Sequence, residues 1–366
     1  MLPMSEPPTR RDDPQRRPAR PLIGSCILAR PMQLPTGGTP LVCLRLQVRG
    51  IERTLRLKLE SYNACGSIKD RTAQSLLHAV EADVDPSLGV IESTSGNLGV
   101  ALAALCSARR LPFTAVVDPR TSELLVMRMR RLGAQVVVVD HPDHEGGYLL
   151  SRLKYVEREL RRQPGLVWTD QYGNEANPNA HQHGTAAELW AQLSAATTVC
   201  IAVSTGGTLA GFQRFVASSG APWRLRGVDV VGSVALGGTA GPRLLSGIGS
   251  SRPATFVPPG TADPVFVTPH EAVSACLWLL RTTGIDVGGS SGAAIAAALQ
   301  QLRDDAGLLD VTCICPDGGD RYLSTLYCAE WRARHGLRLV DVAAAVVPLG
   351  GTDLGGRYDL AARVSA

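Results

Sequence analysis

Short apolar segments alternate with longer helical patterns along most of this 366-residue chain. Residues 90–93, 113–118 and 135–140 are three such segments, each with several β-branched residues, and a helical pattern follows each one. Strands that read as near-continuous apolar runs are typical of parallel sheets with both faces buried. The alternation therefore predicts an α/β fold with mostly parallel sheets covered by helices.

The composition fits a globular protein, with 45% hydrophobic and 19% charged residues. The length suffices for two domains, since domains typically contain about 100 to 200 residues. Residues 1–21 differ from the rest, because they carry six prolines and five arginines without a periodic apolar face. This composition predicts a disordered tail.

The basic tail is compatible with a nucleic-acid or acidic partner, but Glu6, Asp12 and Asp13 dilute its charge. We therefore expect no nucleic-acid partner. The tail lacks the apolar core of a secretory signal, and the chain contains no run of about 18 apolar residues. These observations predict a soluble cytoplasmic protein that does not enter a membrane.

Nine cysteines are scattered through the chain, mostly in apolar segments, without the C-x-x-C spacing of a zinc site. We interpret them as buried free thiols. His181 and His183 form an isolated pair, so the sequence predicts no metal site.

Lys69 lies in a polar turn between an alternating strand at residues 54–60 and a helical pattern at residues 72–80. It is one of only three lysines among 37 basic residues. Only an amine forms a Schiff base with an aldehyde cofactor, and the pKa of a lysine falls readily on desolvation. Lys69 is therefore the candidate catalytic residue, and the alternative is a solvated lysine at a helix start. We interpret Lys58 and Lys154 as structural.

A glycine-rich turn follows the predicted strand at residues 198–203 and starts a helix. Free backbone N–H groups at a helix start, together with the helix dipole, hold a phosphate. The spacing is neither that of a Walker loop nor that of a Rossmann motif, and a tight turn without a ligand is an equally good interpretation. The turn consists of Ser204, Thr205, Gly206, Gly207 and Thr208.

Two further turns follow predicted strands, and the carboxyl ends of strands in an open α/β sheet converge on one crevice. The turn at residues 94–98 is compatible with an anion such as an α-carboxylate, or with simple N-capping by Ser95 or Asn97. The turn at residues 288–292 places Ser290 at a helix start. Its hydroxyl either donates to a ring nitrogen or caps the helix, and capping is favoured from these residues alone. Residues 170–181, around Gln171 and Tyr172, lack a regular pattern, which indicates a ligand-binding loop.

An amine, a phosphate turn, a second anion turn and a hydroxyl for a ring nitrogen together match the groups that bind pyridoxal phosphate. Four motifs in this order resemble those of the fold type II pyridoxal-phosphate enzymes of the cysteine synthase and cystathionine β-synthase family. These motifs are Ser67-x-Lys69-Asp-Arg, Thr94-Ser-Gly-Asn97, Thr205-Gly-Gly-Thr208 and Gly289-Ser-Ser-Gly292.

The resemblance spans about residues 25–331 and implies two three-layer α/β/α domains with mostly parallel sheets, as in the tryptophan synthase β-subunit. Residues 22–61 plus 170–335 are expected to form a large cofactor-binding domain. Residues 62–169 are expected to form a smaller mobile domain that carries the carboxylate loop. Residues 336–366 are a C-terminal extension to which we assign no role.

The resemblance also implies roles for individual residues. Lys69 is expected to form the Schiff base, Asn97 to bond the cofactor 3′-oxygen, and Ser290 to bond its pyridine nitrogen. Residues 204–208 are expected to hold the cofactor phosphate. The expected contacts to substrate come from Thr94, Ser95, Gly96 and Gln171 at the carboxylate, and from Tyr172 beside the incoming substrate. Arg152 is our own candidate for the phosphate of O-phosphoserine or a carboxylate of glutamate, because guanidinium groups bind both anions. The alternative is a surface arginine.

Other segments are similar to a narrower branch, the N-(2-amino-2-carboxyethyl)-L-glutamate synthases. These segments are Val117-Asp-Pro-Arg120, Gly146-Gly-Tyr148, Gln171-Tyr-x-Asn174, Val228-Asp-x-x-Gly-Ser233 and Gly319-Asp-Arg-Tyr322. Enzymes of this branch join O-phospho-L-serine to L-glutamate by β-replacement, which leads to 2,3-diaminopropionate for siderophores and peptide antibiotics. The resemblance therefore implies a transferase for small amino-acid substrates, working as a cytoplasmic homodimer.

Two alternatives stay open at this point. A cysteine synthase acting on O-phosphoserine or O-acetylserine differs only in its nucleophile, which is sulfide. A binding or regulatory protein would keep the fold without turnover, although the intact Lys69 and the complete phosphate turn argue against it. Asp170, where the branch often has asparagine, adds a negative charge near a site for anionic substrates.

Overall fold

A computed structural model describes residues 34–143, 147–260 and 263–349. The predicted tail at residues 1–21, residues 22–33 of the predicted large domain, Gly146 and residues 350–366 lie outside these ranges. The described chain forms two sheets, one of seven strands and one of four. The predicted α/β class is confirmed.

The seven-stranded sheet has the order β11-β1-β2-β10-β7-β8-β9. Strand β1 pairs antiparallel with β2 and β11, whereas the other neighbours are parallel. The strands are β1 Leu41–Val48, β2 Ile51–Leu59, β7 Thr197–Ala202, β8 Trp223–Val230, β9 Val265–Val267, β10 Asp310–Cys315 and β11 Val346–Pro348.

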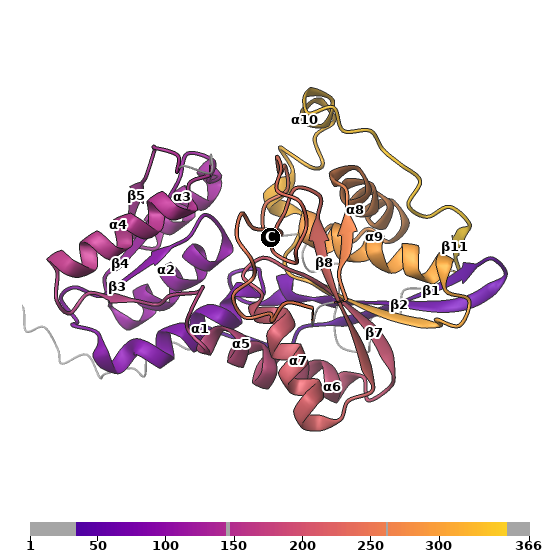
Figure 1. Ribbon diagram of the computed structural model, residues 1–366, viewed down its shortest axis with the longest axis horizontal. Helices are drawn as coiled ribbons and strands as arrows, with labels where there is room; N and C mark the ends of the chain where they lie inside the picture. The colour runs from indigo at the N-terminus through magenta and orange to yellow at the C-terminus, as the bar shows by residue number, and fades with distance from the viewer. Residues whose placement is uncertain (1–33, 144–146, 261–262, 350–366) are drawn as a thin grey trace, which may run out of the picture. The chain divides into compact units, whose positions relative to one another are not determined.

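Helices cover both faces of this sheet, with α6 and α7 on one side and α8 and α9 on the other (Figure 1). Successive side chains of a strand point to opposite faces. Accordingly Cys200 and Cys313 lie in the core cluster with α8 and α9, whereas Val199, Ile201 and Ile314 lie in the cluster with α6 and α7. The helices near this sheet are α5 Ala176–Ala180, the π-helical segment η3 His181–Ala186, α6 Ala187–Gln192, α7 Gly207–Ser219, α8 Pro269–Thr283, α9 Gly289–Asp304 and α10 Ala329–Arg334.

The four-stranded sheet has the order β5-β4-β3-β6, and all of its strands are parallel. Val90 and Ala115 pack in one core cluster with α1, α2 and α3, whereas Ile91 and Val116 pack in a second cluster with α4. The elements are α1 Lys69–Val80, β3 Val90–Ser93, α2 Asn97–Arg109, β4 Phe113–Val117, α3 Glu123–Arg131, β5 Gln135–Val138, α4 Leu149–Arg162 and β6 Val167–Trp168. Short 3-10 turns are η1 Glu60–Tyr62, η2 Glu81–Asp83 and η4 Asp320–Tyr322.

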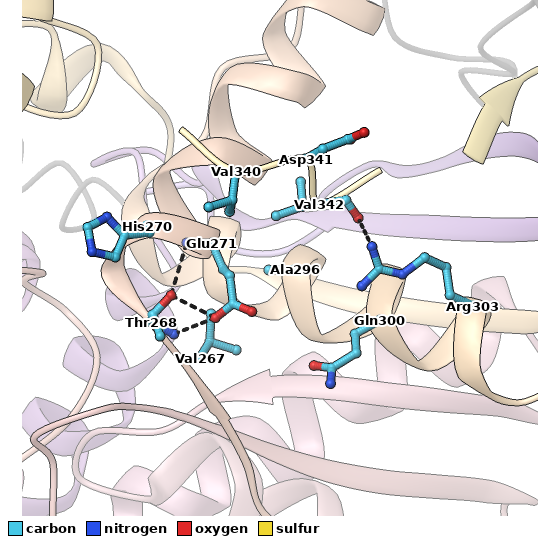
Figure 2. A pocket seen from close by; sticks show the side chains of 10 residues that line it. All are labelled: Val267, Thr268, His270, Glu271, Ala296, Gln300, Arg303, Val340, Asp341 and Val342. Carbon is cyan, nitrogen blue, oxygen red and sulfur yellow. Dashed lines mark hydrogen bonds between the residues drawn. The ribbon is translucent and has the colours of Figure 1, made fainter. Parts of the chain in front are cut away.

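The described part of the predicted C-terminal extension packs on the large sheet. Strand β11 pairs with β1, and Arg303 of α9 donates a hydrogen bond from Nη1 to the carbonyl of Val342 at 3.0 Å. Residues 340–342, α8 and α9 surround a cavity of about 290 Å³ (Figure 2). Glu271 at this cavity forms a capping box with Thr268 at the start of α8. The charged groups of Glu271 and Arg303 are thus used in structural contacts.

The element boundaries show where sequence patterns were insufficient. Residues 170–181 were predicted to be irregular, but they include the short helix α5, and residues 181–186 form a π-helical turn instead of a plain helix start. The short strands β6, β9 and β11 were not predicted. The division into the predicted domains stays a prediction, although every strand of the four-stranded sheet falls within residues 62–169.

Other expectations concern cysteines, metals and membranes. The cysteines of the described ranges are free thiols, most of them buried, as predicted. Within those ranges, no group of three or more His, Cys, Asp and Glu side chains is arranged to hold a metal ion. No helix formed by the described residues is long and apolar enough to cross a membrane.

Candidate active site

Lys69 is the first residue of α1, at a point where the chain is tied to the end of β10. Ser67 forms an isolated bridge with Asp317, and the N–H of Ile68 donates to the carbonyl of Pro316 at 2.8 Å. Burial lowers the pKa of the Lys69 ammonium group, and the charge of Asp317 opposes this shift. Among the described residues, the amine forms no hydrogen bond or ion pair. The candidate Schiff-base lysine is therefore desolvated and unpaired.

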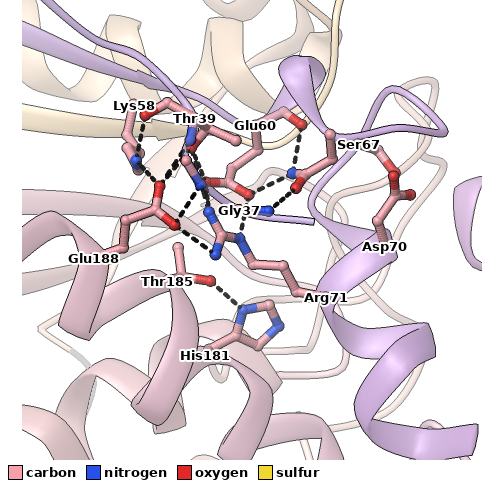
Figure 3. A network of polar contacts seen from close by, with 12 residues as sticks. Gly37, Thr39, Lys58, Glu60, Ser67, Asp70, Arg71, His181, Thr185 and Glu188 are labelled. Carbon is pink, nitrogen blue, oxygen red and sulfur yellow. Dashed lines mark hydrogen bonds and ion pairs between the residues drawn. The ribbon is translucent and has the colours of Figure 1, made fainter. Parts of the chain in front are cut away.

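Lys58 is also buried, but its amine is fully engaged (Figure 3). It donates to Glu188 Oε1 at 2.5 Å, to Gln192 Oε1 at 2.8 Å and to a backbone carbonyl. Glu188 Oε2 lies 3.0 Å from Nη1 of Arg71, and Nε of Arg71 lies 2.7 Å from Glu60. This network connects α1 with β2 and α6, so Lys58 is structural, as interpreted from the sequence.

The glycine-rich turn before α7 has a backbone that only glycine adopts readily. Gly206 is the N-cap at φ 92°, in the left-handed region, and a Cβ on Gly207 would collide with the side chain of Asn177. Gly206 provides no side-chain cap for α7, but the N–H of Gly207 donates to Thr205 Oγ1 at 3.4 Å. The next N–H groups, of Thr208 and Leu209, have no side-chain acceptor in the described ranges and are available to an anion, as the phosphate prediction requires.

Side chains from other elements hold this turn in place. Ser204 Oγ donates to the carbonyl of Gly249 at 3.2 Å. Asn177 Nδ2 donates to Thr205 Oγ1 at 3.3 Å and to the carbonyl of Gln171 at 2.7 Å. Thr208 Oγ1 lies 3.4 Å from Nε2 of the buried His181. The predicted phosphate turn is thereby connected to the segment that carries Gln171.

His181 links the same turn to α1. Its Nε2 lies 3.1 Å from Thr72 Oγ1, and its Nδ1 lies 3.0 Å from Thr185 Oγ1. Burial lowers the pKa of His181 well below its usual value, and the charges of Lys69 and Arg71 act in the same direction. The ring is therefore neutral at physiological pH and serves as a hydrogen-bonding link. Sequence reasoning had treated His181 only as a rejected metal ligand.

The turn before α2 leaves part of the helix N-terminus open. Gly96 is the N-cap without a side-chain cap, and Thr94 Oγ1 accepts from the N–H of Gly99 at 3.0 Å. Neither Ser95 nor Asn97 caps the helix, so the capping alternative is wrong. Ser95 is exposed. The first two N–H groups of α2 thus have no side-chain acceptor within the described ranges, which suits a carboxylate.

Asn97 is oriented by two residues of the segment that follows β10. Its Nδ2 donates to Asp317 Oδ2 at 2.8 Å, and its Oδ1 accepts from Nη1 of Arg321. The hydroxyl of Tyr322 donates to the same Asp317 oxygen at 2.7 Å. Burial raises the pKa of Asp317. These contacts fix the amide so that the second Nδ2 hydrogen is available to a ligand oxygen.

Asp317 was not singled out in the sequence, although it follows the end of a predicted strand directly. That position is where residues of an α/β site gather. A Cβ on Gly288 would also collide with Asp317, which shows that the start of α9 packs against this carboxylate. Asp317 thus lies among Lys69, Asn97 and the helix that carries Ser290.

Ser290 is the second residue of α9 and only 2% exposed. Gly288 is the N-cap of this helix, and no side chain of the described residues caps it. The favoured interpretation of Ser290 as a helix cap is therefore wrong. Its hydroxyl remains available to a ring nitrogen.

Gln171 lies beside the turn before α2. Its Nε2 donates to the carbonyl of Ser93 at 2.8 Å, and its N–H donates to Glu92 Oε2 at 3.2 Å. Burial raises the pKa of Glu92 to about 7, although hydrogen bonds from Thr169 and its neighbours oppose the rise. Asp170, at φ 50°, accepts from the N–H of Tyr172 at 3.1 Å. Its carboxylate therefore stabilises the turn.

Two arginines flank Tyr172. The guanidinium carbon of Arg252 lies 4.5 Å from the centre of the Tyr172 ring. Arg152 is only 6% exposed and lies 3.3 Å from Asp118 Oδ2, yet its Nε and Nη1 make no hydrogen bond with the described residues. The alternative of Arg152 as a surface arginine is wrong. Burial raises the pKa of Tyr172, while the charges of Arg152 and Arg252 oppose the rise.

These features fit the pyridoxal phosphate that the resemblance implies. The open N–H groups of α7 suit its phosphate, Asn97 its 3′-oxygen and Ser290 its ring nitrogen, while Lys69 supplies the amine. The α2 N-terminus, with Gln171 beside it, suits a substrate carboxylate. Asn177 and Asp317, which sequence reasoning missed, connect these parts through the contacts described above.

Comparisons with known proteins show which family and which relatives this chain is similar to. Residues 32–317 match the family described as pyridoxal-phosphate dependent enzyme. The chain is 40% identical over 302 residues to an N-(2-amino-2-carboxyethyl)-L-glutamate synthase of Ralstonia nicotianae, with 81% of this chain and 89% of the relative covered. A synthase of the same name from Cupriavidus metallidurans is 39% identical, with 85% and 94% covered.

Among solved structures, the chain is similar to an O-acetylserine dependent cystathionine beta-synthase from Helicobacter pylori. The TM-score is 0.72 at 31% identity, and 81% of this chain and 100% of that chain are covered. These comparisons confirm the resemblance drawn from the four motifs, the fold type and the cofactor.

Proposed function

Because this chain belongs to the family of pyridoxal-phosphate dependent enzymes, we propose that it joins O-phospho-L-serine to L-glutamate by β-replacement. The products are N-(2-amino-2-carboxyethyl)-L-glutamate and phosphate, and the first leads to 2,3-diaminopropionate for a siderophore or peptide antibiotic. The observation that carries the proposal is the unpaired, desolvated amine of Lys69, at a site whose helix N-termini are open to anions. The names of the two relatives support the product and its glutamate part, while the choice of O-phospho-L-serine rests on the resemblance of the motifs.

When bound, pyridoxal phosphate withdraws electrons from the substrate, so that the Cα proton becomes acidic and the group on Cβ can leave. Lys69 acts as the general base that takes the Cα proton, and its lowered pKa favours the neutral amine that this role needs. The Ser290 hydroxyl donates to the ring nitrogen. Thr94, Ser95, Gly96 and Gln171 hold the substrate α-carboxylate at the start of α2.

The phosphate leaves toward Arg152, whose Nη1 lacks a hydrogen-bond partner among the described residues, while its Nε lies 3.3 Å from Asp118 Oδ2. Guanidinium groups bind phosphate in two-point contacts, which suits this anion. The amine of glutamate then forms the new C–N bond at Cβ beside Tyr172, and Lys69 returns its proton to Cα. Closure of residues 62–169 over the substrate would exclude water during these steps. The resemblance also supports a cytoplasmic homodimer.

A cysteine synthase is the second candidate, and the similarity to an O-acetylserine dependent enzyme favours it. The two functions differ in the nucleophile, so product analysis separates them. We expect the purified holoenzyme, given O-phosphoserine with glutamate and sulfide together, to yield N-(2-amino-2-carboxyethyl)-L-glutamate by mass spectrometry. Cysteine as the sole product, with glutamate left unchanged, would contradict the proposal. The K69A protein serves as the control for uncatalysed addition.

A further inference from the structure

Arg252 is a charged side chain at the candidate site to which no role has yet been given. It lies between β8 and β9, where Ser250 Oγ accepts from its N–H at 3.1 Å and the N–H of Ser250 donates to Ser233 Oγ at 2.9 Å. These contacts fix the backbone on which the side chain stands. The position of Arg252 is therefore set by the fold.

The guanidinium of Arg252 stacks on a ring but forms no hydrogen bond or ion pair with a described residue. Its stacking on Tyr172 at 4.5 Å is a cation–π contact, which supplies no hydrogen-bond acceptor. No other described residue forms a hydrogen bond or ion pair with it. Five N–H donors are thus free to meet an anion, and a fixed guanidinium loses little entropy when it does so.

The nearby carboxylates do not compensate this charge. Asp118 pairs with Arg152 at 3.3 Å, Asp170 accepts from the backbone of its own turn, and Glu92 accepts from Thr169 at 2.5 Å. Arg152 acts on the pKa of Tyr172 in the same direction as Arg252, and it is more deeply buried than the half-buried Arg252. The two guanidinium groups therefore offer one deep and one accessible position for anions.

Glutamate, the second substrate, needs the accessible guanidinium of Arg252. Glutamate enters after phosphate has left, and it carries two carboxylates beside the amine that attacks Cβ. Sulfide carries no such group and needs no cation to orient it. We propose that Arg252 binds a carboxylate of the amine substrate, so that this site selects a dicarboxylic amino acid over sulfide. The inference rests on the proposed function and names the residue that selects its amine substrate.

Three variants test the proposal in the holoenzyme. R252Q removes the charge, R252K keeps a charge without the planar fork, and R158Q is the matched control, because Arg158 stacks on Tyr155 of α4 at 4.6 Å. Three readouts are compared: the KM for glutamate, the rate with sulfide, and the burst of phosphate from O-phosphoserine alone. Glutarate, a dicarboxylate without an amine, is added as a competitor of glutamate.

We expect R252Q to raise the glutamate KM roughly 10- to 100-fold, the loss typical of a charge-assisted hydrogen bond. The inhibition constant of glutarate should rise by a similar factor, and R252K should be intermediate. The phosphate burst and the sulfide rate should stay within about twofold of the unaltered enzyme, and R158Q should change none of these readouts.

The contrary results are distinct. An unchanged glutamate KM in R252Q would overturn the inference while leaving the proposed function intact. An equal loss in all three readouts would show that Arg252 only supports the Tyr172 ring. If the unaltered enzyme formed no product from glutamate, the proposed function would fail, and the inference with it.

Discussion

Lys58 and Lys69 are both desolvated, Lys58 being fully buried and Lys69 partly exposed, but they differ in their partners. Lys58 has an acceptor for each of its three ammonium hydrogens, and one of these acceptors is the carboxylate of Glu188. Lys69 has no acceptor in the described part of the chain, and only the more distant charge of Asp317 favours its charged form. Both side chains are desolvated, so the difference lies in their partners.

The same contrast appears at the helix N-termini. Helix α8, at the cavity near the C-terminal segment, is closed by the capping box of Thr268 and Glu271. At the candidate site, α9 has no side-chain cap among the described residues, and α7 has only the 3.4 Å contact of Thr205 Oγ1 with its first N–H. Unsatisfied buried groups cost free energy, and they gather where a ligand completes them. The fully paired region stabilises the fold, whereas the open region is where we propose that cofactor and substrate bind.

The largest expected effect comes from removing the unpaired amine. K69A should lose at least about 10³-fold in turnover, because no other described group replaces this general base. Borohydride reduction of the holoenzyme followed by peptide mass spectrometry should label Lys69. The matched variant K154A, on the outer helix α4, should keep both activity and labelling. Labelling at Lys58 would show that the paired lysine, and not Lys69, forms the Schiff base.

Removing the carboxylate partner of Lys58 should lower the stability of the fold and not the chemistry of the site. E188A removes the carboxylate partner of the buried Lys58 and leaves Arg71 with Glu60 alone, and loss of one partner in such a network costs about 3–5 kcal/mol. Denaturant unfolding measures the loss. E175A removes a carboxylate that pairs with Arg214 at the surface, and should cost less than about 1 kcal/mol. Equal losses in the two variants would show that the network is no more important than a surface pair.

The pH dependence of the cofactor-free protein tests the desolvation of Lys69. Burial lowers the pKa of Lys58 as well, so the comparison with K69M isolates the contribution of Lys69. Burial lowers the pKa of Lys69 in the folded state, so the unfolded chain binds more protons between that value and the usual pKa. Stability from this group therefore rises with pH through that window. We expect the free energy of unfolding to rise less between pH 7 and 9.5 in K69M than in the unaltered protein. An identical slope in both proteins would contradict a desolvated amine.

The smallest expected effect concerns the helix starts. T268A removes the cap of α8 and should cost about 1 kcal/mol, as loss of an N-cap usually does. S290A in the cofactor-free protein should cost less, because the Ser290 hydroxyl caps nothing in α9. Thermal unfolding of both variants provides the comparison. A larger loss for S290A would restore the capping role that the structure contradicts.

Much of the fold could be predicted because its strands are apolar runs separated by helices of clear periodicity. The strand at residues 90–93 was predicted with its observed bounds. Strands β9 and β11 were missed because three residues carry no periodicity, and they form only by pairing with β8 and β1. In the π-helical turn, His181 contacts Thr185 of the same turn and Thr72 of α1, and the second contact is far away in the chain and leaves no local pattern.

For the site, sequence reasoning placed the turns but not the contacts between them. Lys69, the glycine pair and Asn97 stand in recognisable local patterns at helix starts. Asp317 and Arg252 do not, because their importance comes from residues far away in the chain, Asn97 and Tyr172. The interpretation of Ser290 as a helix cap was wrong for a related reason. Whether a serine caps a helix depends on where its hydroxyl points, and the residue type does not determine this.

The short strand β11 has a consequence for the solubility of the protein. It pairs with Leu46, Gln47 and Val48, and so covers one end of the eight-residue edge of β1, whose apolar side chains alternate. Exposed edges of this kind recruit strands from other molecules. A protein shortened to end at Val340 would lose this cover, and its characteristic failure would be intermolecular strand pairing and aggregation, even with every residue of the candidate site in place.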